Sequence, residues 1–183
     1  MNIIPLSIRD VKIIEPDRFE DERGFFSPLY EEQQFYRLGI SDKFTRLNSS
    51  FSRKKGTIRG LHYQLAPKQE AKMIRVVQGR IWDITLDLRE NSPTFGLWQG
   101  IELCAQTRNW LYIPAGCAHG FQTVEDSSEV LYLCSSDYDV RAERGIRWDD
   151  AAFQISWPLQ PTVLSPKDRS WPNFHSSHQK ASE

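Results

Sequence analysis

The sequence contains little that marks a membrane or secreted protein. No apolar run approaches the roughly 20 residues that span a bilayer. Residues 1–5 have neither the basic start nor the small-residue cleavage site of a signal peptide. The three cysteines, Cys104, Cys117 and Cys134, are widely spaced and form no Cys-x-x-Cys pair. Such cysteines argue against a disulfide framework and a structural zinc site, so we expect a cytoplasmic protein that does not associate with membranes.

Neither sign of charge is in excess. The chain has 23 Lys and Arg residues against 24 Asp and Glu residues, a formal net charge of −1. A chain so close to neutral is not a general binder of polyanions, and we expect no nucleic-acid partner. The basic run Arg53–Lys55 is interpreted as a solvated hairpin turn. Any affinity for phosphate must therefore come from a local cluster of cations.

Helical patterns are also scarce. Only Glu31–Leu38 is predicted to be helical, and Gly39 ends it. The rest shows short strand patterns separated by glycine and proline, which predicts an antiparallel sandwich or barrel. The predicted strands are Ile8–Ile14, Met73–Val77, Ile81–Leu88, Gly100–Cys104, Trp110–Ile113, Gly120–Thr123 and Val130–Ser135. The 183 residues contain no internal repeat, so we expect one domain (1–183) in which residues 175–183 form a flexible tail.

One cationic segment combines two kinds of chemistry. Residues 56–64 read Gly-Thr-Ile-Arg-Gly-Leu-His-Tyr-Gln, and Lys72 follows ten residues after His62. Arginine suits bidentate contact with phosphate, whereas histidine moves protons near neutral pH. On a strand Arg59 and His62 are out of phase, so a bend or bulge near Gly60 is needed to bring them together. The alternative is a surface arginine and a half-buried histidine beside a turn.

A second histidine lies at the start of a predicted strand. The proline and glycines of Ile113–Phe121 form a turn that delivers His119, which could serve as a metal ligand, a phosphate contact or a structural hydrogen-bond donor. Many small metal-binding β-barrels use a His-x-His motif followed closely by glutamate. Here Gln64 stands two residues after His62, and no carboxylate follows at that spacing. Two histidines without a shared motif are a poor ligand set, and we expect no metal site.

Two further residue types have open interpretations. Tyr132, in phase with Val130 and Cys134, is either a proton donor or a core aromatic residue with one satisfied hydroxyl. Tyr138, six residues later, could stack on a base. Asp168 is a surface carboxylate unless it reaches a histidine.

Six motifs follow one another in order between about Val11 and Asp168. They occupy residues 21–26, 56–64, 92–96, 113–121, 143–148 and 165–168. Together they resemble the dTDP-4-dehydrorhamnose 3,5-epimerase family, the cofactor-free epimerases of nucleotide-linked 4-keto-6-deoxy sugars. The resemblance implies an all-β, cupin-like jelly roll (a double-stranded β-helix barrel) with one or two short helices. It also implies a homodimer, a dTDP-linked 4-keto-6-deoxy sugar as the substrate, and neither cofactor nor metal.

The resemblance further implies roles for single residues. His62 matches the base that removes the proton next to the ketone, and Asp168 matches the carboxylate that orients this base. Lys72 matches the lysine beside the sugar O4, and Tyr132 matches the acid that returns a proton from the opposite face. Positions that match contacts to the nucleotide or its phosphates, with the two aromatic ones beside the thymine, are Arg23, Phe26, Asn48, Arg59, His119, Tyr138, Glu143 and Lys167.

The implied reaction converts dTDP-4-keto-6-deoxyglucose to dTDP-4-keto-L-rhamnose by inversion at C3 and C5. The ketone makes hydrogens at both carbons acidic because the carbanion delocalises as an enolate, so an acid and a base suffice. Two positions depart from the family pattern: Pro28 stands where many relatives have glutamate, and Arg46 replaces a common glutamine. We keep open an epimerase that acts on C3 or C5 alone and, less favoured, a metal-dependent cupin enzyme or a nucleotide-sugar binding module.

Overall fold

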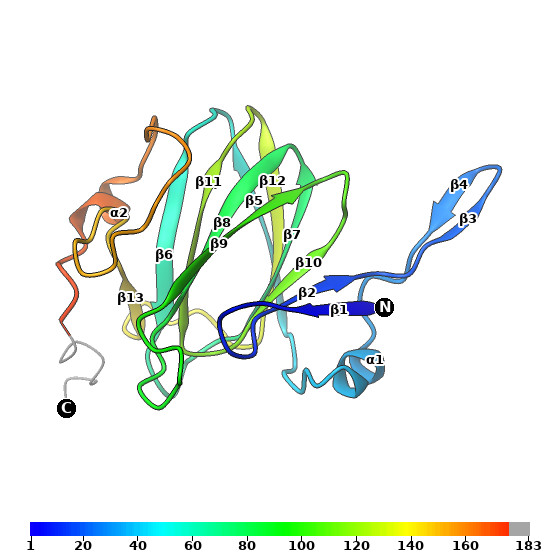
Figure 1. Ribbon diagram of the computed structural model, residues 1–183, viewed down its shortest axis with the longest axis horizontal. Helices are drawn as coiled ribbons and strands as arrows, with labels where there is room; N and C mark the ends of the chain where they lie inside the picture. Colours follow the sequence, from blue (N-terminus) through cyan, green and yellow to red (C-terminus); the bar gives the residue numbers. More distant parts are fainter. Residues whose placement is uncertain (176–183) are drawn as a thin grey trace.

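Two antiparallel sheets that face each other dominate the computed structural model, which describes residues 1–175 (Figure 1). One sheet has six strands in the order β1-β2-β10-β7-β12-β5, and the other has five in the order β13-β6-β11-β8-β9. The strands are β1 (Asn2–Pro5), β2 (Lys12–Glu15), β3 (Phe19–Asp21), β4 (Gly24–Phe26), β5 (Arg46–Ser52), β6 (Ile58–Gln64), β7 (Lys72–Gln78), β8 (Arg80–Asp87), β9 (Trp98–Cys104), β10 (Trp110–Ile113), β11 (Cys117–Thr123), β12 (Ser128–Cys134) and β13 (Glu143–Gly145). The all-β, cupin-like prediction is confirmed.

Two short helices accompany the sheets. Helix α1 (Glu32–Arg37) falls within the predicted helix and ends as predicted, because Gly39 adopts a left-handed conformation with φ of 75°. Helix α2 (Pro166–Ser170) is capped by the Ser165 hydroxyl, which accepts a hydrogen bond from the Asp168 amide. Within residues 1–175, no helix is long and apolar enough to cross a membrane.

Strand alternation creates three buried apolar clusters. The cluster between the two sheets includes Ile74, Leu111 and Phe121. On the outer face of the five-stranded sheet, the chain that follows β13 covers a second cluster. On the outer face of the six-stranded sheet, Phe35 of α1 packs against a third. Because both sheets are covered on their outer faces as well as between them, a central strand can be buried on both sides.

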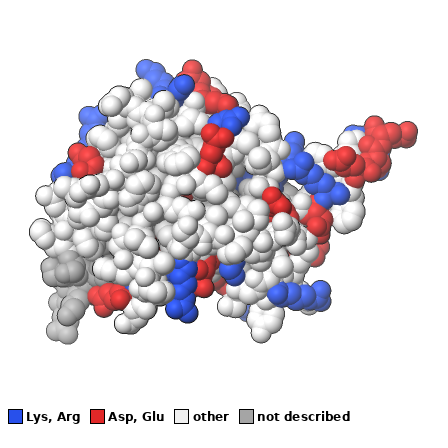
Figure 2. Space-filling view, in the orientation of Figure 1, with Lys and Arg blue, Asp and Glu red and all other residues white. Residues whose placement is uncertain are grey.

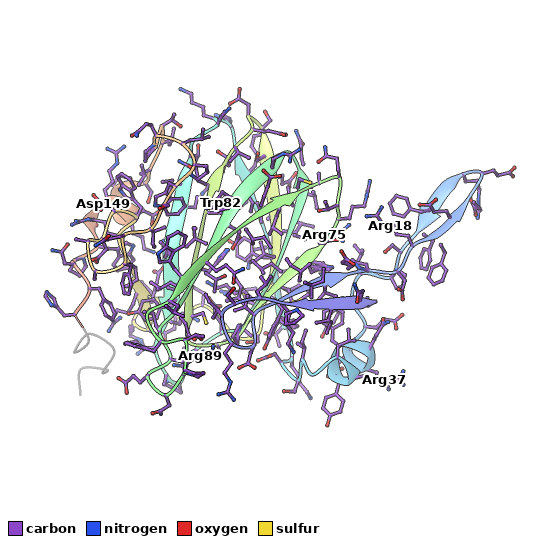
Figure 3. All side chains as sticks on the ribbon, in the orientation of Figure 1. Arg18, Arg37, Arg75, Trp82, Arg89 and Asp149 are labelled. Atoms are coloured by element: carbon purple, nitrogen blue, oxygen red, sulfur yellow. The ribbon has the colours of Figure 1, made fainter. Side chains whose placement is uncertain are left out.

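Strand β8 is such a strand. The predicted alternation of its residues is present, but its polar face is as buried as its apolar one: Asp83, Thr85 and Asp87 are at most 2% exposed. On the other face Trp82 lies across Gly100 of β9, where an added Cβ would come within 2.4 Å of the indole (Figure 3). A polar row is therefore held inside the molecule, where each of its carboxylates requires hydrogen-bond partners.

Two predictions differ from the structure. The strand expected at Ile8–Ile14 forms only from Lys12, because the chain turns through residues 7–10 to pair β2 with the unpredicted strand β1. Asp10 adopts φ of 68° in that turn. The basic run Arg53–Lys55 is a turn but not a hairpin, since β5 and β6 belong to different sheets. The tail expected at 175–183 lies, apart from its first residue, outside the described residues.

Strands β3 and β4 form an arm that projects from the sheets (Figure 1). All its residues are exposed, including Phe19 and Phe26 at 60% and 70%. At the base of the arm the Arg18 guanidinium donates to the Thr107 carbonyl oxygen at 2.7 Å (Figure 3). Figure 2 shows acidic side chains gathered at the tip and no broad field of one charge on the face in view. Apolar side chains of the arm are thus left exposed to solvent.

Candidate active site

A cavity of about 380 Å³ opens between the two sheets. Both sheets and the segment leading into α2 contribute to its lining, and α2 packs on β6 (Figure 1). The cavity collects all four predicted catalytic residues and three predicted binding residues: His62, Lys72, Tyr132, Asp168, Arg59, His119 and Lys167. A larger cavity of about 600 Å³ lies among the loops that follow β6 and β8, but none of the predicted site residues lines it.

A bulge in β6 brings Arg59 and His62 to the same cavity. His62 pairs with His119 of β11 and Arg59 with Phe121, so β6 has one residue more than its partner between these pairs. Gly60 in the bulge has φ of 109°, and a Cβ there would meet the Gly120 Cα at 2.6 Å. The predicted bend near Gly60 is confirmed, because without it the two side chains would point to opposite faces.

His62 and Asp168 form a hydrogen-bonded pair. The distance from His62 Nε2 to Asp168 Oδ1 is 2.6 Å, and the Gly60 amide donates to the other oxygen at 3.3 Å. Burial opposes ionisation of Asp168, but the hydrogen bond and charge of His62 outweigh it and hold the pKa of this carboxyl below its usual value. An ionised Asp168 accepts a hydrogen bond from the protonated Nε2, which leaves the Nδ1 lone pair of His62 free to act as a base. The sequence left open whether Asp168 contacts a histidine, and the structure shows that it does.

Lys72 and Tyr132 lie on the opposite wall, in the six-stranded sheet. They stand on neighbouring strands β7 and β12, and both line the cavity. The Lys72 ammonium donates to the His62 carbonyl oxygen at 3.3 Å. Burial raises the pKa of Tyr132, so its hydroxyl is protonated at neutral pH and can donate. The arrangement places a base and a proton donor on facing walls.

His119 has a partner that the sequence did not reveal. Its Nε2 lies 2.8 Å from Asp83 Oδ2, and the carboxylate is fully buried on β8. The other carboxylate oxygen, Oδ1, makes no hydrogen bond within the described part of the chain. The alternating Asp-x-Thr-x-Asp row of β8 was the available signal, but it pointed equally well to a solvated face. Residues 1–175 contain no group of three His, Cys, Asp or Glu side chains placed to hold a metal ion.

A charged cluster borders the cavity. Lys167 Nζ lies 2.5 Å from Glu143 Oε2, and the Tyr138 hydroxyl donates to the same oxygen at 2.7 Å. Burial opposes ionisation of Glu143, but these two hydrogen bonds outweigh it and lower the pKa of Glu143. Arg59 is held by the Ser52 hydroxyl at 3.0 Å and by the Phe51 carbonyl oxygen. Two cations are thus fixed at the cavity, as anion binding requires.

Three predicted binding residues stand elsewhere. Asn48 of β5 is paired with Tyr132, but its amide contacts the Cys134 sulfur at 3.8 Å. Arg23 and Phe26 lie in the β3–β4 arm, where Arg23 is paired with Asp21 and largely exposed. The chain does not bring its own arm to its own cavity.

Comparison with known proteins decides the family. Residues 5–176 match the family model described as dTDP-4-dehydrorhamnose 3,5-epimerase. The chain belongs to this family. The dTDP-4-dehydrorhamnose 3,5-epimerase of Shigella flexneri is 43% identical over 175 residues, which cover 95% of this chain and 96% of that protein. As a member of the dTDP-4-dehydrorhamnose 3,5-epimerase family, this protein is an isomerase.

Solved structures of the family agree with the fold. The Bacillus anthracis dTDP-4-dehydrorhamnose 3,5-epimerase with TDP and PPi bound superposes with a TM-score of 0.91 at 40% identity, covering 94% of this chain and 99% of that one. A 3,5-epimerase from Legionella pneumophila in complex with dTDP-4-keto-L-rhamnose superposes with a TM-score of 0.87 at 39% identity, covering 93% and 90% of the two chains. The fold of this chain is thus the one seen in solved structures of its family.

Proposed function

We propose that this protein epimerises dTDP-4-keto-6-deoxyglucose at C3 and C5, giving dTDP-4-keto-L-rhamnose, without a cofactor. The observation that carries the proposal is the His62–Asp168 pair, which faces Lys72 and Tyr132 across one cavity. Inversion needs a proton removed from one face of a carbon and returned to the other. Groups on opposite walls satisfy this requirement.

In the proposed first step, His62 takes the proton from the carbon next to the ketone. Asp168 keeps the imidazole in the tautomer that can accept it and stabilises the imidazolium that forms. The electron pair moves into an enolate, and negative charge develops on O4. The Lys72 ammonium, which lies in the cavity wall on a largely buried side chain, stabilises this charge.

In the second step, Tyr132 returns a proton to the carbanion from the facing wall. Its raised pKa keeps the phenol protonated until the enolate forms. Solvent then takes the proton from His62 and returns one to Tyr132, after which the same pair of groups acts at the second carbon. Because the substrate's own ketone accepts the electron pair, the proposed chemistry needs no redox group.

We propose that Arg59, Lys167 and His119 contact the diphosphate and nucleotide, with Glu143 and Tyr138 beside them. Arg59 and Lys167 line the cavity as fixed cations, and Tyr138 is 53% exposed next to Lys167 through the shared Glu143. Binding energy from the diphosphate would hold the sugar ring between the acid and the base. Asn48 lies beside Tyr132 on the same face of the six-stranded sheet.

Arg23 and Phe26 fit the proposal only in a homodimer. Their arm projects from the chain that carries it, with exposed apolar rings on a short two-stranded sheet. Such surface is stabilised when a partner covers it. We therefore propose that the arm of one protomer lies at the cavity of the other and brings Arg23 and Phe26 to its nucleotide.

The test is a proton NMR time course with dTDP-4-keto-6-deoxyglucose in D2O. We expect solvent deuterium at C3 and C5 with the wild-type protein and none with His62→Ala, while both proteins bind dTDP. Exchange in the variant at the wild-type rate would contradict the proposal. Exchange at one carbon only would identify a single-centre epimerase, and binding without exchange would indicate a binding module. Activity lost on chelation and restored by a metal would indicate the metal-dependent alternative.

A further inference from the structure

Lys72 belongs to a row of side chains that crosses three neighbouring strands. Cys134 of β12 pairs with Arg46 of β5 on one side and with Lys72 of β7 on the other. Directly paired residues of antiparallel strands project to the same face. Arg46 and Lys72 are therefore two cations on the inner face of one sheet, separated by a single strand whose thiol is fully buried.

Glu70, just before β7, lies between these two cations. Its Oε2 is 2.7 Å from Arg46 Nη2, whereas its Oε1 is 3.4 Å from Lys72 Nζ. Charge-assisted hydrogen bonds are shortest at about 2.7–2.9 Å. One oxygen of the carboxylate is thus bound by Arg46, whereas the other contacts Lys72 only loosely. The side chains of Glu70 and Lys72 are 8% and 10% exposed, so these charges are weakly screened by solvent.

We propose that Arg46 is a positioning residue for Lys72. By binding Glu70, Arg46 keeps this carboxylate from closing on the Lys72 ammonium, so that the lysine charge remains directed at the substrate oxygen. This inference rests on the proposed function, in which Lys72 stabilises the O4 enolate. Arg46 and Glu70 act only through Lys72, because neither is among the residues that line the cavity.

The charge balance of the site supports this role. Arg46 and Lys72 carry two positive charges against one negative charge on Glu70, so the group of three is left with one positive charge. Cys134 does not alter this balance, since burial raises the pKa of its thiol and keeps it neutral. With a neutral residue at position 46, Glu70 would have Lys72 as its only cation in this row. The ion pair would then neutralise the charge that the enolate needs.

The first test compares Arg46→Gln with the wild type in steady-state turnover of dTDP-4-keto-6-deoxyglucose. We expect kcat to fall about tenfold with KM changed less than about twofold, because a direct oxyanion contact contributes more than a residue acting through it. Arg46→Lys keeps the positive charge and should retain most of kcat. The matched control is Arg37→Gln on the exposed face of α1, which should leave kcat unchanged (Figure 3).

The decisive variant is the double substitution Arg46→Gln/Glu70→Gln. Without the Glu70 charge no carboxylate forms an ion pair with Lys72, and kcat should recover to within about threefold of the wild type. A role limited to stability predicts no recovery, since the double variant also lacks the ion pair. Wild-type kcat in Arg46→Gln, or an uncorrected loss in a folded double variant, would overturn the inference.

A crystal structure of Arg46→Gln tests the geometric step independently of activity. We expect Glu70 Oε1 within about 3 Å of Lys72 Nζ, the distance of a direct charge-assisted hydrogen bond. A separation that stays at 3.4 Å or grows would overturn the inference. If instead the wild-type protein shows no exchange of C3 or C5 hydrogens, the proposed function fails, and this structure still decides whether Arg46 restrains Glu70.

Discussion

The two histidines of the cavity have similar partners but different surroundings. His62 lies 2.6 Å from Asp168 and His119 lies 2.8 Å from Asp83, and both carboxylates are buried. The His62 side chain is 33% exposed, whereas that of His119 is 10% exposed. A general base has to reach its substrate and then exchange its proton, which suits the more open histidine. The more enclosed His119–Asp83 pair suits a binding contact that stays in place during the reaction.

Replacing Tyr132 separates the two halves of the proposed reaction. In Tyr132→Phe, His62 can still remove a proton and return deuterium to the same face. We therefore expect the recovered sugar to carry deuterium with retained configuration, while inversion falls at least about 100-fold. NMR of the sugar in D2O measures both. Inversion at the wild-type rate would show that another group returns the proton.

Asp87 shows how a buried carboxylate can serve stability alone. Burial opposes its ionisation, but hydrogen bonds from Arg89, Ser92 and Thr94 outweigh this and hold its pKa far below the usual value. The folded-state pKa is thus lower than the unfolded one of about 3.9. The contribution is complete above the unfolded pKa and is lost as the pH falls towards the folded one.

We therefore expect Asp87→Asn to lower the free energy of unfolding by about 3 kcal/mol at pH 7. At pH 3 the difference between variant and wild type should be smaller by about 1 kcal/mol, since the unfolded carboxylate is then mostly protonated. Urea unfolding at both pH values measures this. The exposed Asp149 provides the control, and Asp149→Asn should change stability by less than about 0.5 kcal/mol (Figure 3). An Asp87 effect independent of pH would refute the account.

At the level of elements, the crossing of β6 and β11 holds the site together. Gly60 and Gly120 touch at this point, and a Cβ on either would approach the other strand's backbone closer than 3.0 Å. The bulge that turns Arg59 and His62 to one side therefore depends on the absence of a side chain.

Gly60→Ala should consequently damage both stability and chemistry. We expect the free energy of unfolding to fall by about 3 kcal/mol, since backbone cannot give way as a flexible side chain does. Thermal and urea unfolding measure this, and exchange at C3 and C5 reports the misplaced His62. Gly96→Ala is the control: Gly96 also has positive φ, but nothing lies within 4 Å of its added Cβ, so a loss of about 1 kcal/mol is expected. Equal losses would rule out the crossing as the cause.

At the level of the whole molecule, one chain holds a cavity with an acid and a base, while two expected nucleotide contacts project away from it. Subunit exchange tests whether they act across protomers. A chain with Arg23→Ala/Phe26→Ala keeps its cavity, and a chain with His62→Ala keeps its arm. In a mixed dimer, one of the two cavities would have both an intact His62 and an intact arm from the other chain.

Co-expressed in equal amounts, the two defective chains should regain about a quarter of wild-type activity, since half the dimers are mixed and each has one complete site. Light scattering on the wild type should give the mass of two chains. Activity no greater than the sum of the separate variants would show that the arm does not serve the partner's cavity.

Local patterns predicted much of the fold and part of the site. The alternation of apolar and polar residues located most strands, and Gly39 located the end of the helix. The phase difference between Arg59 and His62 predicted the bulge at Gly60. Such features depend on neighbours a few residues away. Strands β1, β3, β4 and β13 were not predicted because they have only three or four residues and need a partner strand to be recognised. The longer strand β5 was not predicted because its mostly polar sequence shows no apolar alternation. The resemblance of the motifs supplied the family before any geometry was known.

Partners far apart in the chain were decided by the tertiary structure. His119 could have met any of several carboxylates, and the pairing of β11 with β8 selected Asp83. Arg46 and Glu70 are 24 residues apart, and the strand order β7-β12-β5 brought Arg46 to the carboxylate that lies next to Lys72. Sequence spacing determines which face of a strand a residue occupies. Which side chains then meet depends on how strands pair and sheets pack, and that is a property of the whole chain.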